Sequence, residues 1–406
     1  MKKPTACGTP SKARTEKPGL RRMRLYYALL LFVTAFTPVI SRAQSQQRPA
    51  GSEPSPELAV PAILATFDSY EVVAMPEAHG LKDLDDFILS LIRNPAFSAK
   101  VNDIAVECGN PLYQPILDRY IAGEDVPFTE VRKVWRNAQL MCGMSGFFEQ
   151  FFPLVRTINQ KLPAGKRLRV LAADSPVDWD QIGRSLQNAP KLPSRDESIA
   201  SVMEKEVLSK HRKALMLFGT LHLLHSVGDS SAVSIYEKDY PNRTFVISEL
   251  GVFDTELPTL SSGPLTSWPI PSLARAKGTW LGSLDLNDFV PAFAITSDCN
   301  VYTQYPKELQ RPIADLVDAF LYLGPQDLRL NEQMPADIAL DVDYMTELQR
   351  RASLAGFPGA IAGSLKEFEE QIVNSAENPL IVQPKTRDPN LLRQKCLDLK
   401  GRGNAQ

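Results

Sequence analysis

The chain has 406 residues, of which 44% are hydrophobic and 23% are charged, and its formal net charge at pH 7 is −2. This is the composition of an ordinary globular protein with one large domain or two modest ones, and it excludes a chain that is disordered throughout. Residues 1–42 alone carry a net charge of +8, so the remainder carries about −10 and has no electrostatic footprint for nucleic acid.

Residues 1–43 are predicted to be a secretory signal peptide. Eight lysines and arginines precede an apolar run over residues 25–40, and a small-x-small pattern follows at residues 41–43. The run contains Pro38 and is short for a membrane span, although an uncleaved signal anchor is the alternative. We therefore expect a periplasmic or secreted protein without a stable membrane span after cleavage.

Three further segments are predicted from composition. Residues 44–57 are polar and rich in Pro, Gln and Ser, which is typical of a linker. Residues 58–330 are expected to form the main α/β domain, and residues 331–406 a helical C-terminal tail.

The cysteines outside the predicted signal are Cys108, Cys142, Cys299 and Cys396. They have no Cys-x-x-Cys spacing, so they do not indicate a zinc site. In an oxidising compartment they could form one or two disulfides, and their spacing leaves the pairing open.

After the linker, a short helix is predicted within residues 55–70, and strands then alternate with helices. The predicted strands are residues 70–75, 101–109, 166–174, 213–225 and 243–253. The predicted helices are residues 81–92, 113–161 with several breaks, and 195–211, where Ser194 and Glu197 have capping-box spacing. The alternation predicts an α/β fold with a mostly parallel sheet. The nearly continuous apolar strands indicate that helices cover both faces of this sheet.

The C-terminal part is expected to be less regular. Residues 254–284 are rich in Pro, Ser and Gly and show few clear elements, whereas residues 313–325 are predicted to be a last strand joining the same sheet. Two helical stretches are predicted in the tail, at residues 344–356 and 364–376.

Polar side chains occur where the predicted strands end. Glu77 and His79 follow the first strand, Glu107 the second and Asp174 the third, and the fourth carries His222. In open parallel α/β sheets, ligands bind outside the carboxyl ends of the strands. We therefore expect these residues to share one edge of the sheet.

Each of these residues also has a structural explanation. His79 could cap the next helix, Glu77 could pair with an arginine, and His222 could be a hydrogen-bonded core histidine. Glu107 ends an apolar run, where a carboxylate is costly unless it is paired or lies at the mouth of the sheet. The dipole of its helix explains the acidic Asp196. It does not explain the basic Arg195 just before it in the same first turn, which indicates a functional role for Arg195.

The motifs PEAHG, VECGN, RDESIA and FGTLH follow one another in this order over residues 69–250. As an ordered set they resemble the superfamily that contains erythromycin esterase-like hydrolases, ChaN-type haem-binding uptake proteins and Tiki/TraB metalloproteases. The chain departs from the family pattern at Pro76, where relatives usually have glycine, and proline forbids backbone conformations that glycine permits.

The resemblance implies five site residues: His79, Glu77, Glu107, Arg195 and His222. In the esterase branch it implies a histidine general base that activates water without a metal. In the Tiki branch it implies a divalent metal ion, here held by His79, His222 and Glu107. In the ChaN branch it implies haem binding without assured catalysis.

The preferred expectation is a secreted or periplasmic hydrolase of ester or amide bonds that uses a His/Glu site, with or without a metal. A histidine oriented by a carboxylate can deprotonate water, and Arg195 could stabilise an oxyanion. Neither a Gly-x-Ser-x-Gly elbow nor a glycine-rich phosphate loop is present, which disfavours serine-hydrolase and nucleotide chemistry. The alternative is a ChaN-type uptake protein that binds haem or a metal without catalysis. The expected partner is accordingly a small molecule, a peptide or haem.

Overall fold

A computed structural model describes most of the chain after residue 50. The described residues are 51–77, 80–182, 193–250, 264–289, 293–296, 298–303, 305–325, 329–354, 370, 373–374 and 389–403. The predicted signal peptide and His79 lie outside them, as does nearly all of the helix predicted at residues 364–376.

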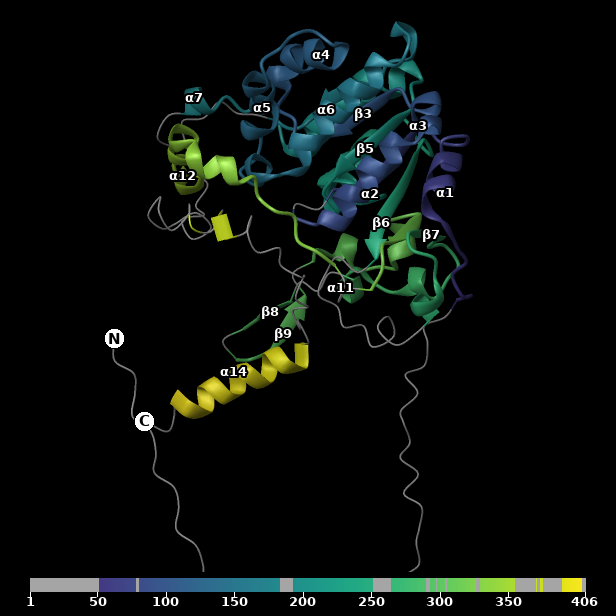
Figure 1. Cartoon of the computed structure of the whole chain (residues 1–406). Coiled ribbons are helices and arrows are strands. Elements are labelled where there is room, and N and C mark those ends of the chain that lie inside the picture. The colour runs from purple at the N-terminus through teal and green to yellow at the C-terminus, as the bar shows by residue number, and fades with distance from the viewer. Residues whose placement is uncertain are drawn as a thin grey trace, which may run out of the picture. The chain divides into compact units, whose positions relative to one another are not determined.

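An eight-stranded sheet lies at the centre of the described structure (Figure 1), in the order β1-β7-β10-β6-β2-β5-β3-β4. Its strands are β1 (Pro56–Leu58), β2 (Val72–Pro76), β3 (Asp103–Val106), β4 (Arg169–Ala172), β5 (Ala214–Phe218), β6 (Thr244–Leu250), β7 (Ser272–Arg275) and β10 (Ala319–Tyr322). The strands from β10 to β4 are parallel, and β7 and β1 add an antiparallel edge. The predicted mostly parallel sheet is therefore confirmed, including the last strand.

Helices cover both faces of this sheet because its central strands send apolar side chains to both. Val73 and Met75 of β2 pack into one core, and Val72 and Ala74 into the other. One face, which we call the α2 face, is covered by α1 (Ala59–Thr66), α2 (Lys82–Arg93), α3 (Pro95–Lys100), α4 (Gln114–Ala122), α5 (Phe128–Arg136) and α6 (Phe147–Gln160). The other, the α8 face, is covered chiefly by α8 (Arg195–Glu206) and α9 (Ala232–Tyr236).

The predicted helix boundaries follow from local chemistry. Ser194 and Glu197 form the capping box at the start of α8. Gly123 ends α4 with a φ of 106°, a left-handed conformation that glycine adopts readily, and Pro127 precedes α5. The helical region predicted at residues 113–161 is therefore three main helices, with one break between Gly123 and Pro127 and a second at residues 137–146.

The fourth predicted strand is shorter than expected. β5 ends at Phe218, and residues 220–222 form the 3₁₀ turn η6 (Thr220–His222). His222 consequently lies beyond the end of the strand and not within it.

Several elements were not predicted. They are the edge strands β1 and β7, the hairpin β8 (Phe293–Ile295) and β9 (Val301–Thr303), the short helices α3, α7 (Trp179–Ile182), α9 and α11 (Leu286–Phe289), and α14 (Pro389–Gly403). The tail helix predicted at residues 344–356 corresponds to α12 (Val342–Leu354). Strand β1 and the bridge between Ser52 and Thr279 lie largely within the segment expected to be a linker.

All four cysteines outside the predicted signal are paired. Cys108 bonds to Cys142 with a Cα–Cα distance of 5.3 Å, and Cys299 bonds to Cys396 with a Cα–Cα distance of 5.7 Å. The first disulfide fastens the end of β3 to the turn before α6, and the second fastens α14 to the β8–β9 hairpin.

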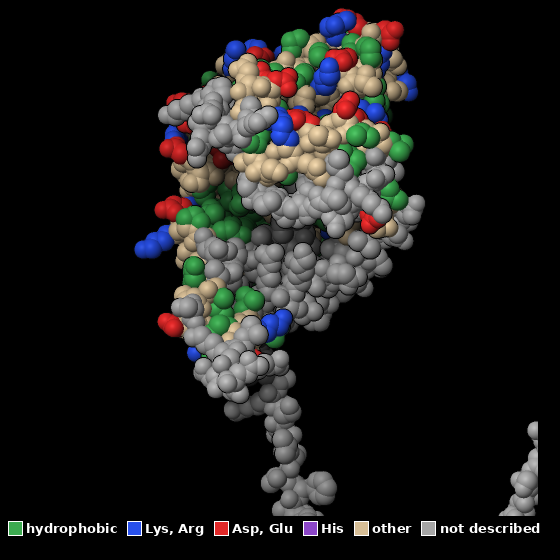
Figure 2. Space-filling view, turned by 90° about the vertical axis from the view of Figure 1, so that its left-hand side faces the viewer, with side chains coloured by type: hydrophobic (Ala, Val, Ile, Leu, Met, Phe, Trp, Pro, Cys, Tyr) green, Lys and Arg blue, Asp and Glu red, His purple; other side chains and the backbone are tan. Residues whose placement is uncertain are grey.

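The surface and the helices add two observations. On the face shown in Figure 2, the described Lys and Arg side chains are interspersed with Asp and Glu. Within the described ranges, no helix combines the length and the apolar composition that crossing a membrane requires.

Candidate functional site

Polar side chains gather at the carboxyl ends of β3, β4 and β5 on the α8 face. Glu107 directly follows β3, and Asp174 comes two residues after β4. Arg195 is the first residue of α8 and reaches both of them with its guanidinium group. This edge is where the loops of a parallel sheet meet and where ligands bind.

The carboxylate of Glu107 is held from two sides. One oxygen, Oε1, accepts from Arg195 Nη2 at 2.5 Å, and the other, Oε2, accepts the Gly219 N–H at 2.5 Å. A Cβ atom added at Gly219 would lie 3.3 Å from Oε2, so the absence of a side chain lets this backbone approach the carboxylate closely. Because Glu107 is only 4% exposed, these charge-assisted bonds replace its hydration.

Arg195 is shared between Glu107 and Asp174. Its Nε donates to Asp174 Oδ1 at 2.8 Å, and Asp174 is 1% exposed. Burial raises the pKa of Asp174 above its ordinary value, and Arg195 offsets this only in part. Burial lowers the pKa of Arg195, but its two carboxylate partners raise this pKa by more than burial lowers it, so the guanidinium stays charged. One fixed positive charge therefore lies between two buried carboxylates.

His222 lies beside this network with its ring oriented by Asp196. The Nδ1 atom is 2.8 Å from Asp196 Oδ1, and Nε2 is 3.8 Å from Glu107 Oε1. Since an ionised carboxylate can only accept, the contact assigns a proton to Nδ1 and leaves Nε2 as the acceptor of the neutral ring. The side chain of His222 is 17% exposed, so Nε2 is close to the surface but partly shielded.

Sequence reasoning missed Asp196. Its place in the first turn of α8 explains an acid through the helix dipole, and no further role was predicted. The structure adds the hydrogen bond to His222, so consecutive residues of α8 hold two parts of the site. The signal for this part of the site was the neighbouring Arg195, because the positive end of a helix dipole disfavours a basic residue.

Glu77 lies on the opposite face from Glu107. Side chains along a strand alternate between the two faces of the sheet. Glu77 is in step with Val73 and Met75, which pack into the core of the α2 face. Glu107 is in step with Ala105, which packs into the core of the α8 face. The structure thus brings Glu107, Arg195 and His222 together and places the side chain of Glu77 across the sheet. His79, the fifth predicted residue, lies outside the described residues.

Pro76 fits the end of β2 because of the register of its neighbours. The Glu77 N–H donates to the Phe218 carbonyl of β5 at 2.9 Å, so the nitrogen of Pro76 faces β6. The pairing of β2 with β6 ends at Ala74, and the missing N–H therefore costs no ladder hydrogen bond.

Glu77 belongs to a second group of carboxyl groups, formed with Asp85 of α2 and with Glu332. Glu77 is 2% exposed and Asp85 is 5% exposed. Burial raises the pKa of Asp85 to about 9, with the charges of Glu332 and Glu77 adding to the effect. Glu332 accepts from the Ser145 hydroxyl at 3.1 Å and from the Phe147 N–H at the start of α6, and burial raises its pKa as well. At neutral pH at least one carboxyl of this group therefore holds a proton.

Asp85→Asn is expected to change how stability depends on pH. In the folded protein Asp85 keeps its proton up to about pH 9, whereas in the unfolded chain it ionises near its ordinary pKa of 3.8. The folded state therefore binds an extra proton in this window and loses stability as pH rises, at most by about 1.4 kcal/mol per pH unit. The asparagine of the variant does not titrate, so this loss of stability with rising pH is absent from the variant.

Urea unfolding of both proteins from about pH 5 to about pH 8 measures this effect. The advantage of Asp85→Asn over the wild type should grow steadily with pH. Asp125→Asn is the control, because Asp125 is exposed and is not one of the charges that raise the pKa of Asp85. Parallel stability curves for wild type and Asp85→Asn would show that Asp85 ionises normally.

The described residues do not fit a metal ion at Glu107. Both oxygens of this carboxylate are engaged, and the guanidinium of Arg195 lies 2.5 Å away, where its charge would repel a dication. No group of three or more His, Cys, Asp or Glu side chains suited to a metal occurs in the described part of the chain. Of the predicted ligands, His222 and Glu107 are described here, and His79 is not.

No protein-family model and no curated protein matches the chain. Among solved structures, a protein from Bacillus cereus has a TM-score of 0.42 and 10% identity, covering 67% of this chain and 94% of its own. A structure of cofacial haem binding to ChaN of Campylobacter jejuni has a TM-score of 0.33 and 14% identity, covering 47% and 84%. An erythromycin esterase mutant in its open conformation has a TM-score of 0.36 and 11% identity, covering 64% and 92%. Two of these names are those of branches that the sequence motifs resemble, but at this distance they carry no functional argument.

Proposed function

We propose that the chain is a hydrolase of ester or amide bonds in which His222 is the general base. The observation that carries this proposal is the 2.8 Å contact between His222 Nδ1 and Asp196, which leaves Nε2 beside the Glu107–Arg195 pair. An imidazole with one nitrogen fixed by a carboxylate and the other able to accept is the arrangement that general-base catalysis requires.

In the proposed reaction, Nε2 of His222 accepts a proton from water while the water oxygen attacks the carbonyl carbon. Asp196 stabilises the imidazolium that forms. Collapse of the tetrahedral intermediate then breaks the bond to the leaving group, which takes the proton back from Nε2. Each proton and electron pair is returned, so no further reactant is needed.

Arg195 is assigned the developing oxyanion. Its Nε and Nη2 atoms are bound to Asp174 and Glu107, so Nη1 is the nitrogen of the guanidinium that is left to donate to a substrate. The two buried carboxylates hold this cation in place before the substrate arrives, which is the kind of preorganisation that makes such donors effective. Glu77, which faces the other side of the sheet, has no part in this step.

Asp196→Asn tests the proposal on a panel of p-nitrophenyl esters and peptide amides. The wild type should hydrolyse at least one of them, and the variant should be slower by about 10²–10⁴-fold because an amide no longer fixes the tautomer or stabilises the imidazolium. The exposed Asp125→Asn is the control and should retain wild-type rates.

The same preparation tests the haem-binding alternative. A saturable Soret shift with haemin that disappears in His222→Ala, together with no hydrolysis anywhere in the panel, would replace the hydrolase proposal.

We also propose that the protein works in the periplasm or outside the cell. The predicted signal peptide supports this, and so do the two disulfides, because such bonds persist in oxidising compartments. Thiol titration of the unfolded protein isolated from its native compartment should find none of these four cysteines free. Four free thiols would contradict the proposal.

A further inference from the structure

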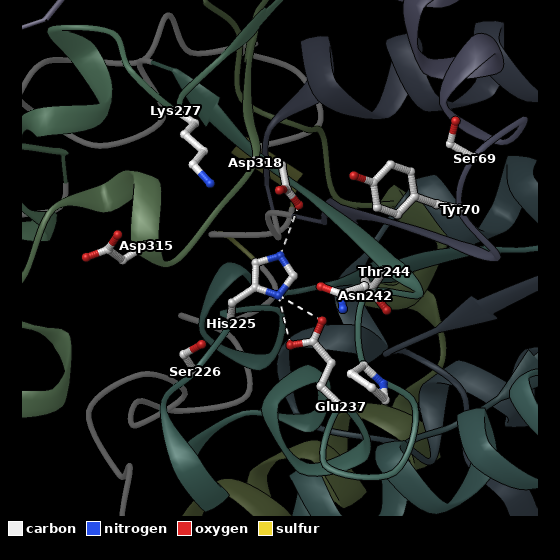
Figure 3. A pocket seen from close by; sticks show the side chains of 11 residues that line it. Ser69, Tyr70, His225, Ser226, Glu237, Asn242, Thr244, Lys277, Asp315 and Asp318 are labelled. Atoms are coloured by element: carbon white, nitrogen blue, oxygen red, sulfur yellow. Dashed lines mark hydrogen bonds and ion pairs between the residues drawn. The ribbon is translucent and has the colours of Figure 1, made fainter.

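A polar pocket, whose lining is drawn in Figure 3, lies at the amino ends of the parallel strands. It is built where β2, β6 and β10 begin, whereas Glu107 and His222 lie where their strands end. Its volume is about 670 Å³, which is within the range of small-molecule sites. None of its lining residues belongs to the site described above.

The floor of this pocket is an imidazole clamped between two carboxylates. His225 Nδ1 lies 2.9 Å from Glu237, and Nε2 lies 3.0 Å from Asp318. Burial lowers the pKa of His225, but hydrogen bonds to Asp318 and Glu237 raise it to about 9, so the ring is an imidazolium at neutral pH. Both nitrogens are engaged, and His225 therefore serves as a fixed part of the wall and not as a base.

The rim carries polar groups of several kinds. They include the hydroxyls of Ser69, Tyr70 and Ser226, the amide of Asn242, the ammonium of Lys277 and the carboxylate of Asp315. In the view of Figure 3, Lys277 and Tyr70 lie on opposite sides of Asp318, and both point inward. Donors and acceptors thus surround one space.

The backbone around the pocket is held in an uncommon conformation. Ser226 and Asn242 both have a φ of 58°, a left-handed value that serine rarely adopts. Backbone strain of this kind clusters at functional sites, because it persists only where the surrounding structure enforces it. Asparagine adopts this conformation readily, but the strained Ser226 at the rim favours a binding role over a chance hollow.

The charges of the lining decide the class of ligand. Three carboxylates and two cations line the pocket, so its formal charge is near −1. Carboxylates disfavour an anion, and the His225 and Lys277 cations disfavour a polyamine. A ligand rich in hydroxyl groups, each of which donates and accepts, matches a wall of mixed donors and acceptors. We propose that this pocket binds a neutral saccharide.

Saturation-transfer NMR and calorimetry with glucose, N-acetylglucosamine, maltose, cellobiose and lactose test the proposal on the full mature chain. At least one of these should bind saturably at millimolar concentration. Two variants change exposed rim groups that the fold does not need. One is Asn242→Gly, which keeps the left-handed φ, and the other is the double variant Lys277→Ala/Asp315→Ala. Each should weaken binding by about tenfold or more.

Asp229→Ala is the matched control, since Asp229 pairs with Lys238 at the surface and does not line the pocket. It should bind as the wild type does. The proposal is overturned if none of the five saccharides saturates, if the rim variants bind as tightly as the control, or if spermidine or citrate binds there instead.

Discussion

Replacing Arg195 by methionine should lower the free energy of unfolding near neutral pH by about 3–5 kcal/mol. Glu107 and Asp174 are almost fully buried and share this cation, so the variant leaves two carboxylates in the interior without it. The loss should be smaller near pH 5, because buried carboxyl groups can then take up protons. Urea unfolding at both pH values measures it.

Two further variants separate this effect from a general loss of packing. Arg119→Met removes an ion pair with Glu124 at 2.7 Å whose side chains are 58% and 54% exposed, so it should change stability by less than about 1 kcal/mol. Adding Glu107→Gln and Asp174→Asn to Arg195→Met should recover much of the lost stability. If Arg195→Met is no less stable than Arg119→Met, the two carboxylates do not depend on this arginine.

Replacing His222 by glutamine should reduce kcat/KM for a hydrolysed ester by about 10²–10⁴-fold, since a positioned general base contributes this much to rate. Glutamine can still bond to Asp196, so stability should change little. His211→Gln is the control, because His211 is a surface residue whose side chain is 75% exposed. Activity of His222→Gln within threefold of the wild type would remove His222 from the mechanism.

Much of the fold could be predicted because each central strand is bounded by a strong local signal. The apolar strands, the Ser194–Glu197 capping box and the breaks near Gly123 and Pro127 all depend on neighbouring residues. The edge strands β1 and β7 have three and four residues, and β7 lies among prolines and serines, so neither shows a clear period. Their pairing is set by distant segments.

The candidate site was predicted only in part, for a physical reason. Strand ends identify an edge of the sheet, but the face to which a side chain points depends on the register between strands. Glu107 and Glu77 each follow a strand, yet they face opposite sides. Asp196 was missed because acids are common in first helical turns.

The disulfide pairing could not be read from sequence either. The bonded cysteines are 34 and 97 residues apart, and their approach depends on how β3 and the β8–β9 hairpin are placed.

The central claim is that Asp196 acts through His222. Comparing kcat/KM of the double variant His222→Gln/Asp196→Asn with that of His222→Gln tests it most directly, because residues that work as one unit are not additive. The two values should agree within about twofold. A further loss of about tenfold or more in the double variant would show that Asp196 has a separate role and would contradict the account.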